Sequence, residues 1–137
     1  MDHQLAFATF HVVGDSVVPS FWTGYFGVEP DTAICKGETF ITPSGRASRA
    51  LGRVGLWGFG SKPFVDSDAL GPHLRYLVDR LNLTRPGLRE LLERERLKAR
   101  FWCYWGNQTG DRIPDVPDDI RVMMESLGGV IEIDEYR

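Results

Sequence analysis

The chain has 137 residues, of which 42% are hydrophobic and 26% charged, and its formal net charge is −3. These values are typical of one globular domain, and the acidic balance argues against a general nucleic-acid binder. No apolar run approaches the roughly 20 residues that span a membrane, and no secretory leader is visible. We therefore expect a single domain over residues 1–137, located in the cytoplasm and not attached to a membrane.

Local patterns predict the first two elements. Residues 5–14 (LAFATFHVVG) are rich in β-branched and aromatic side chains and end at a glycine, which predicts a strand. Residues 18–27 place aromatic side chains at helical spacing, with Pro19 in the first turn and Gly27 where the helix would end. We expect a helix there, although Val18 before the proline provides no side-chain cap.

A pair of strands with a basic connection follows. Residues 32–42 and 54–61 have strand-forming side chains, and PSGRASRALGR between them begins with a turn signal. The connection contains Arg46, Arg49 and Arg53 and no acidic residue. Long loops in compact domains often bind partners, so these arginines are candidate binding residues, and plain exposure to solvent is the alternative.

The C-terminal part of the chain alternates between helix and strand signals. Leucines recur at helical spacing from residue 70 to residue 81, and Asp66, Ser67 or Asp68 is placed to cap that helix. We expect helices over 66–82, 85–96 and 117–129 and strands over 97–105 and 130–136. The order β-α-β-β-α-α-β-α-β favours an α+β fold, a mostly antiparallel sheet of about five strands with helices packed on one face.

Seven short motifs occur along the chain in a combination typical of one family. They are ATFHVVGD, YFGVEP, CKGE, GLWGF, HLRYLVDRL, FWCYW and IDEY. In this order they resemble the bacterial domain of unknown function 4279 family over nearly the whole chain. Val18 departs from the pattern of that family, which has an acidic cap before the proline. The resemblance supports the fold and implies no particular activity, catalytic residue or cofactor.

The glycine-rich stretch GRVGLWGFGSK, residues 52–62, raises the question of a phosphate-binding loop. A dinucleotide fingerprint needs G-x-G-x-x-G between a strand and a helix, whereas the gaps here come in the reverse order. A Walker loop ends in Gly-Lys-Ser/Thr, whereas this stretch ends in Gly60-Ser61-Lys62. The residues between the glycines are strand formers, so we predict a glycine-bearing strand and no cofactor.

No catalytic or metal-binding motif is evident in the sequence. His3, His11 and His73 share no metal-ligand spacing, and Cys35 and Cys103 match none either, so we expect buried, reduced thiols and no metal. His73 is the one catalytic candidate, in a small hydrolase with a nearby carboxylate, and the resembled family also has a histidine there. A structural role at the start of a helix, through side-chain-to-backbone bonding, is the favoured interpretation.

The segment 97–105 (LKARFWCYW) has two different faces as a strand. Lys98, Arg100, Trp102 and Tyr104 alternate on one face, and apolar side chains alternate on the other. Cations and large aromatics on one sheet face suit protein–protein hot spots, and they also suit stacking with single-stranded nucleic acid. An ordinary half-solvated face is the third interpretation.

From these observations we predict a non-enzymatic domain whose partner is another protein. The binding residues would be the cations and aromatics of segment 97–105 together with the three arginines of the basic connection. Neutralisation of a toxin or nuclease is one version, by loose analogy with other compact α+β bacterial families. Single-stranded nucleic-acid binding on the same sheet face is the alternative, followed by the small hydrolase that uses His73.

Overall fold

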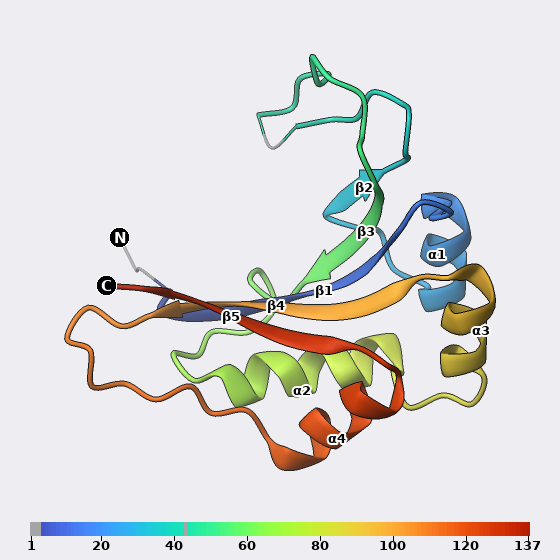
Figure 1. Ribbon diagram of the computed structural model, residues 1–137. Coiled ribbons are helices and arrows are strands. Elements are labelled where there is room, and N and C mark those ends of the chain that lie inside the picture. The colour runs from blue at the N-terminus through green and yellow to red at the C-terminus, as the bar shows by residue number, and fades with distance from the viewer. Residues whose placement is uncertain (1–3, 43) are drawn as a thin grey trace.

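The computed structural model describes residues 4–42 and 44–137 and contains five strands and four helices among them (Figure 1). The strands are β1 (Ala6–Gly14), β2 (Thr32–Ile34), β3 (Gly55–Gly60), β4 (Lys98–Gly106) and β5 (Val130–Tyr136). The helices are α1 (Pro19–Phe26), α2 (Leu70–Leu81), α3 (Leu88–Glu95) and α4 (Asp118–Ser126). The elements follow the predicted order, and the α+β class is confirmed.

The five strands form one sheet in the order β2-β3-β1-β4-β5. The pairs β1–β3, β1–β4 and β2–β3 are antiparallel, and β4 pairs with β5 in parallel. The parallel pair requires a crossover connection, and the segment between the two strands that contains α4 provides it. The prediction of a mostly antiparallel sheet is confirmed, with one parallel pair at its edge.

Alternate residues of the two central strands bury one face of the sheet. Ala8, Phe10 and Val12 of β1 have an exposed fraction of 0%, and so have Ala99 and Phe101 of β4. Full burial of a valine or phenylalanine side chain, such as Val12 or Phe10, contributes about 1.5–3 kcal/mol to stability. Because strand geometry sends neighbouring residues to opposite faces, the residues between them lie on the other side of the sheet.

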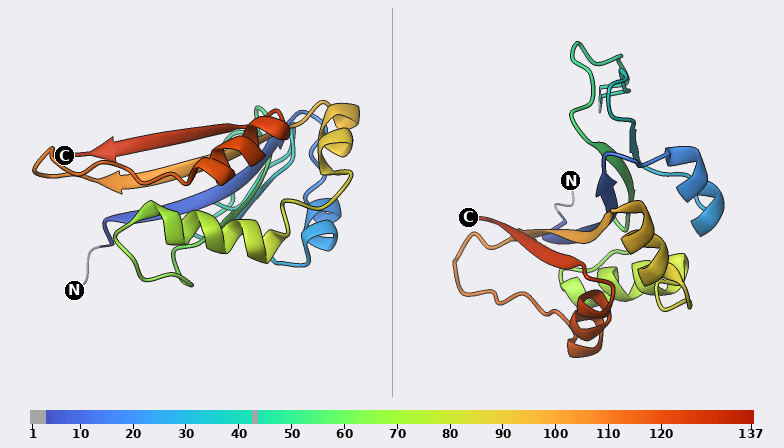
Figure 2. Two further views of the ribbon diagram at one scale, coloured as in Figure 1. Left: turned by 90° about the horizontal axis from the view of Figure 1, so that it is seen from below. Right: turned by 45° about the vertical axis from the view of Figure 1, so that its right-hand side comes forward.

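Helices α1 and α2 supply side chains that pack against this buried face. Figure 1 shows α2 and α4 along one side of the sheet, with α1 and α3 together near one end of it. The turned views of Figure 2 show the same arrangement. The ring of Phe26 in α1 lies 5.8 Å from that of Phe10 and 5.1 Å from that of Trp57. Leu74 and Leu77 of α2 are fully buried in the same core.

We name the segment between β2 and β3, residues 35–54, the excursion, and it differs from the prediction over residues 35–42. The strand expected over 32–42 is wrong beyond β2, because the described residues that follow make two isolated bridges instead of a ladder. Gly37 and Gly45 adopt the left-handed region, with φ of 81° and 83°, which interrupts extended structure. The excursion leaves the sheet and projects away from α2 and α4 (Figure 1).

Helix α2 begins at Leu70, and its first turn is capped from a distant part of the chain. The Asp115 carboxylate accepts hydrogen bonds from the backbone N–H of Leu70 at 2.7 Å and of Gly71 at 2.8 Å. A Cβ at position 71 would lie 2.9 Å from Oδ2 of Asp115, so the glycine permits this approach. The predicted cap within residues 66–68 is wrong, because the connection after β4 supplies the carboxylate.

Replacing Asp115 by Ala should lower the free energy of unfolding by about 1–2 kcal/mol, because two N–H groups of the first turn lose their acceptor. Chemical denaturation followed by circular dichroism measures this change. Asp66→Ala is the matched control, since Asp66 is exposed beside the same helix start. Equal losses in the two variants would contradict the capping role of Asp115.

Candidate interaction surface

The predicted binding residues of β4 lie on the side of the sheet opposite the core. Lys98 is exposed, whereas Arg100, Trp102 and Tyr104 are half-buried and alternate with buried neighbours. Strand register places side chains of β1 and β5 beside them, and we name this side the open face. Its members are Phe7, Thr9, His11, Lys98, Arg100, Trp102, Tyr104, Val130, Glu132, Asp134 and Tyr136.

A row of aromatic rings crosses the open face from β1 to β5. Phe7 stacks on Tyr104 with ring centroids 4.9 Å apart, and its ring lies 5.9 Å from that of Trp102. Tyr104 in turn stacks on Tyr136 at 5.0 Å, and the Lys62 ammonium lies 5.0 Å from the centroid of the Phe7 ring. These contacts restrict the rings, so Trp102 and Tyr104 are presented in defined positions.

Sequence reasoning missed Phe7, Tyr136 and Lys62 as members of this surface. The alternation within residues 5–14 already places Phe7 out of phase with the apolar side chains of that strand. Tyr136 likewise shares the phase of the outward carboxylates in β5. Lys62 reaches the Phe7 ring because β3 pairs with β1, and no local pattern in the sequence indicates that contact.

A histidine on the neighbouring strand holds Arg100 in place. The Nε and Nη2 atoms of Arg100 donate hydrogen bonds to Nδ1 of His11, at 3.1 and 2.8 Å. Burial first, and the positive charge of Arg100 second, lower the pKa of His11 from 6.5 to about 4. At neutral pH the His11 ring is therefore uncharged, with its hydrogen on Nε2.

The glycines of β3 make room for neighbouring side chains. A Cβ on Gly58 would lie 2.8 Å from Cδ2 of His11, and a Cβ on Gly60 would lie 2.9 Å from Oδ2 of Asp31. The same Asp31 oxygen accepts a hydrogen bond from the N–H of Gly60 at 2.6 Å. The prediction of a glycine-bearing strand is confirmed, and these two glycines permit close packing across the sheet.

Strand β5 adds negative charge to the open face. In its register with β4, Glu132 lies beside Trp102 and Asp134 lies beside Tyr104. The Asp134 carboxylate accepts a hydrogen bond from the Tyr136 hydroxyl at 2.6 Å, and this bond raises the pKa of Tyr136. The open face thus combines cations, aromatic rings and carboxylates, whereas the pattern within β4 predicts only the first two.

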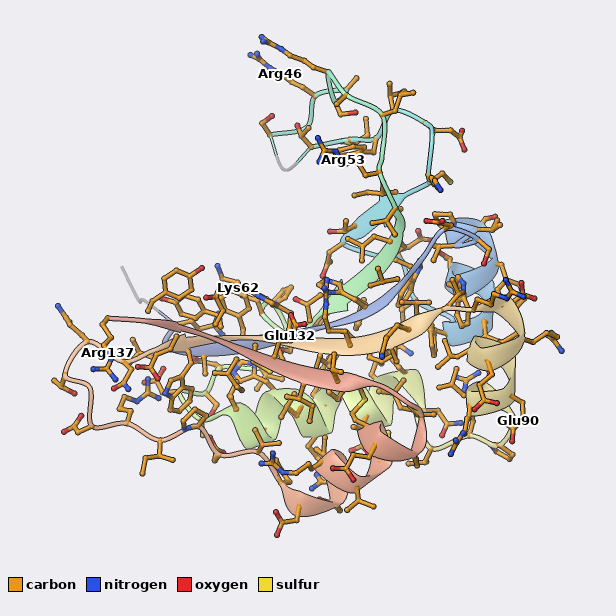
Figure 3. All side chains as sticks on the ribbon, in the orientation of Figure 1. Arg46, Arg53, Lys62, Glu90, Glu132 and Arg137 are labelled. Atoms are coloured by element: carbon orange, nitrogen blue, oxygen red, sulfur yellow. The ribbon has the colours of Figure 1, made fainter. Side chains whose placement is uncertain are left out.

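The three predicted arginines of the basic connection lie on the excursion, apart from the cations of the open face. Arg46, Arg49 and Arg53 are exposed, and Figure 3 shows Arg46 and Arg53 on the excursion, with Lys62 and Glu132 at the sheet. None of the three arginines forms an ion pair with another described residue. The predicted binding residues therefore form two separate groups, one on the sheet and one on the excursion.

The catalytic candidate His73 lies in the interior of the protein. Its exposed fraction is 0%, and so is that of Ser61. Nε2 of His73 donates to the backbone carbonyl of Ser67 at 2.8 Å, so Nδ1 accepts the hydroxyl hydrogen of Ser61 at 2.7 Å. These bonds join the end of β3 to the start of α2. The ring of His73 therefore has no surface open to a substrate in this structure.

The two thiols have different surroundings, and neither forms a disulfide. Cys103 is buried as expected, and burial raises its pKa to about 12, so the thiol stays protonated at neutral pH. Cys35 is half-buried at the start of the excursion, because β2 ends at the preceding residue. The expectation that both thiols are buried is therefore wrong for Cys35.

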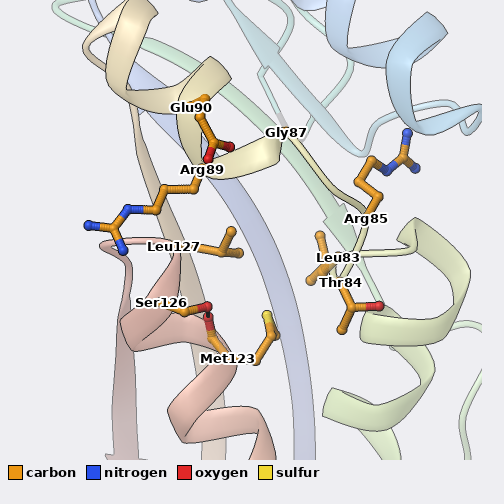
Figure 4. A pocket seen from close by; sticks show the side chains of 9 residues that line it. All are labelled: Leu83, Thr84, Arg85, Gly87, Arg89, Glu90, Met123, Ser126 and Leu127. Carbon is orange, nitrogen blue, oxygen red and sulfur yellow. Dashed lines mark hydrogen bonds between the residues drawn. The ribbon is translucent and has the colours of Figure 1, made fainter.

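A pocket of about 340 Å³ lies between the α2–α3 connection and the end of α4 (Figure 4). Figure 4 shows the aliphatic side chains of Leu83, Met123 and Leu127 around its middle. Arg85 turns away from it and donates hydrogen bonds to backbone carbonyls, including that of Tyr25 at 2.8 Å. Glu90 is the one carboxylate among the residues that line this pocket, so the pocket offers no acid–base pair.

Among the described residues, 4–42 and 44–137, no three side chains of His, Cys, Asp or Glu gather as metal ligands would. No helix among these residues has both the length and the apolar character needed to cross a membrane.

Comparison with known proteins identifies a family. A family model described as Domain of unknown function (DUF4279) matches residues 3–137, essentially the whole chain. The resemblance indicated by the sequence motifs is thereby confirmed. No curated protein and no solved structure matches the chain.

His73→Ala should lower the free energy of unfolding by about 2–4 kcal/mol, because it opens a cavity and removes one buried partner of the Ser61 hydroxyl, which keeps its bonds to the backbone of Ala8. Thermal and chemical unfolding measure the loss. Arg80→Ala, an exposed change on the same helix, is the control. A His73→Ala variant as stable as the wild type would contradict the structural role.

Lowering the pH should lower the free energy of unfolding, because His11 takes up a proton more readily in the unfolded chain. Its pKa is about 4 in the folded protein and near 6.5 in the unfolded chain, so below pH 6.5 the unfolded chain takes up the proton first. The contribution of His11 should drop by about 2 kcal/mol between pH 7 and pH 5, and the loss should be complete below pH 4. Unfolding of the wild type and His11→Gln at both pH values isolates this contribution, since Gln keeps an acceptor for Arg100 and does not titrate. Parallel pH dependence in the two proteins would rule out the lowered pKa.

Proposed function

We propose that this chain, which belongs to the family described as Domain of unknown function (DUF4279), is a non-enzymatic module that binds another protein through its open face. The observation that supports the proposal is the aromatic row beside Arg100, on the side of the sheet opposite α2 and α4. The proposal assigns no chemical reaction to the protein, because His73 is fully buried.

The residue types of the open face favour a protein partner. Arg, Trp and Tyr are the residues enriched in binding hot spots, and β4 presents one of each at Arg100, Trp102 and Tyr104. Their neighbours already restrict them: His11 accepts the hydrogen bonds of Arg100, and Phe7 packs on both rings. Side chains that are ordered before binding lose less entropy when the complex forms.

The carboxylates of β5 favour a protein partner over a nucleic acid. Glu132 and Asp134 stand directly beside Trp102 and Tyr104, so a phosphate backbone stacked along these rings would meet negative charge. A protein surface can offer cations to these carboxylates and carboxylates to Arg100 in one complex. Single-stranded nucleic acid remains the second candidate, supported by Arg100 and by the two aromatic rings, which are half-buried.

The excursion provides a second group of contacts for the same kind of partner. Arg46, Arg49 and Arg53 are exposed, without an acidic residue between them in the chain. Ile41 and Leu51 of the excursion are also exposed, by 69% and 57%. Exposed aliphatic side chains among cations suit an acidic protein surface that has an apolar patch.

The Trp102→Ala/Tyr104→Ala double variant should weaken binding to the protein partner by at least about tenfold, because two hot-spot side chains are removed. Affinity capture from cell lysate, with and without nuclease and at low and high salt, identifies what binds the wild type. The affinity of the purified partner is then measured for each variant. Phe21→Ala is the matched control, since Phe21 is an exposed aromatic of α1, 47% exposed, that is outside the open face.

The outcomes separate the candidates. A nuclease-resistant protein lost from the double variant and retained by Phe21→Ala supports the proposal. Nucleic acid that disappears with salt and with the double variant supports the second candidate instead. A protein partner that binds the double variant as tightly as the wild type would show that the open face is not the binding surface. Circular dichroism of each variant confirms that it is folded.

A further inference from the structure

Strand β5 lies at the edge of the sheet, with β4 as its neighbour on one side. It runs over Val130–Tyr136, which is longer than β2 at the opposite edge. Figure 2 shows its long outer side along the border of the molecule. The backbone N–H and C=O groups on that side are therefore available to pair with another extended chain.

A pocket of about 290 Å³ adjoins the start of this edge strand. Its lining comes from α4, the residues that follow it and the start of β5: Arg121, Met124, Glu125, Gly129, Val130 and Ile131. Met124 and Ile131 give the pocket an apolar floor on the helix side of the sheet. Ile133, 37% exposed, continues this apolar side along the strand. An added strand would find a place here for aliphatic side chains.

The other side of the same strand is negatively charged. Glu132 and Asp134 point to the open face, and Glu132 forms no ion pair with another described residue. Two copies of β5 paired antiparallel about Ile133 would place Glu132 of each copy opposite Asp134 of the other. Like charges directly opposite each other destabilise a strand pair, so the charge disfavours a second copy as the occupant.

We propose that the outer edge of β5 binds an extended segment of a partner protein in which Lys or Arg alternates with aliphatic residues. The segment would pair as a sixth strand of the sheet. Its cations would lie opposite Glu132 and Asp134, and its aliphatic side chains would lie beside Ile131 and Ile133, with the pocket at one end. This surface goes beyond the proposed function, because it uses the edge of the sheet and not the aromatic row.

A synthetic peptide of about eight residues that alternates Lys and Val is the probe. Fluorescence anisotropy should show that it binds the wild type, and a peptide with the same composition, but with the Lys and Val residues in separate blocks, should bind at least about tenfold more weakly. Glu132→Lys/Asp134→Lys should lose at least about tenfold in affinity for the alternating peptide, because two opposite-charge pairs become like-charge pairs. Glu90→Lys is the matched control, since Glu90 is exposed on α3 at a distance from Glu132 (Figure 3).

Hydrogen exchange of the wild type tests strand addition directly. The alternating peptide should slow exchange of the outward amides of β5, because they gain acceptors. Equal binding of the two peptides, unchanged affinity in the Glu132→Lys/Asp134→Lys variant or unchanged exchange in β5 would each overturn the inference. Binding of the alternating peptide to the Trp102→Ala/Tyr104→Ala variant distinguishes the two proposals. Retained peptide binding with lost partner binding would show that the edge of β5 and the open face act separately. Partner binding by the wild type without peptide binding would overturn the edge proposal alone.

Discussion

Strands β1 and β4 pair antiparallel along the middle of the sheet. Their register places the buried residues of one strand opposite the buried residues of the other. Phe10 lies opposite Phe101 in the core, with ring centroids 5.6 Å apart, and His11 lies opposite Arg100 on the open face. A slip of one residue in either strand would bring its apolar set to the open face and its polar set into the core. Burial therefore fixes this register, and the open face is its consequence.

Polar contacts between distant segments then hold α2 against the sheet. The buried His73 ring is bonded at both nitrogens, to Ser61 at the end of β3 and to the backbone of Ser67. The carboxylate of Asp115, in the connection after β4, accepts hydrogen bonds from the first two free backbone N–H groups of the helix. Buried donors and acceptors are costly when unpaired, so these contacts select one position for the start of α2. A Ser–His pair that resembles catalytic geometry is part of the scaffold here.

The candidate binding residues lie on two kinds of element: strands of the sheet and the excursion. The aromatic row and the His11–Arg100 pair are held by three adjacent strands, so the open face is presented with little freedom. The arginines of the excursion project from a segment whose described residues form turns and two isolated bridges in place of a strand ladder. The acidic side chains of β5, Glu132 and Asp134, belong to the open face and lie on the edge strand of the sheet. A partner that contacts all of these groups would need an acidic region for the arginines, an apolar region for the aromatic row and a basic region for the carboxylates of β5. A folded protein can combine the three.

The sequence by itself determined the order of the elements, the two-faced character of β1 and β4 and the nature of the glycine-bearing β3, because each depends on the period of nearby side chains. Only the tertiary structure decided that Phe7, Tyr136 and Lys62 join the β4 aromatics, that Asp115 caps α2 and that most of the strand expected over 32–42 becomes the excursion. These features depend on which strands pair and in which register, and on contacts between segments far apart in the chain. Local patterns show which residues of a strand face the core, whereas the burial of the whole core determines which strands pair with each other.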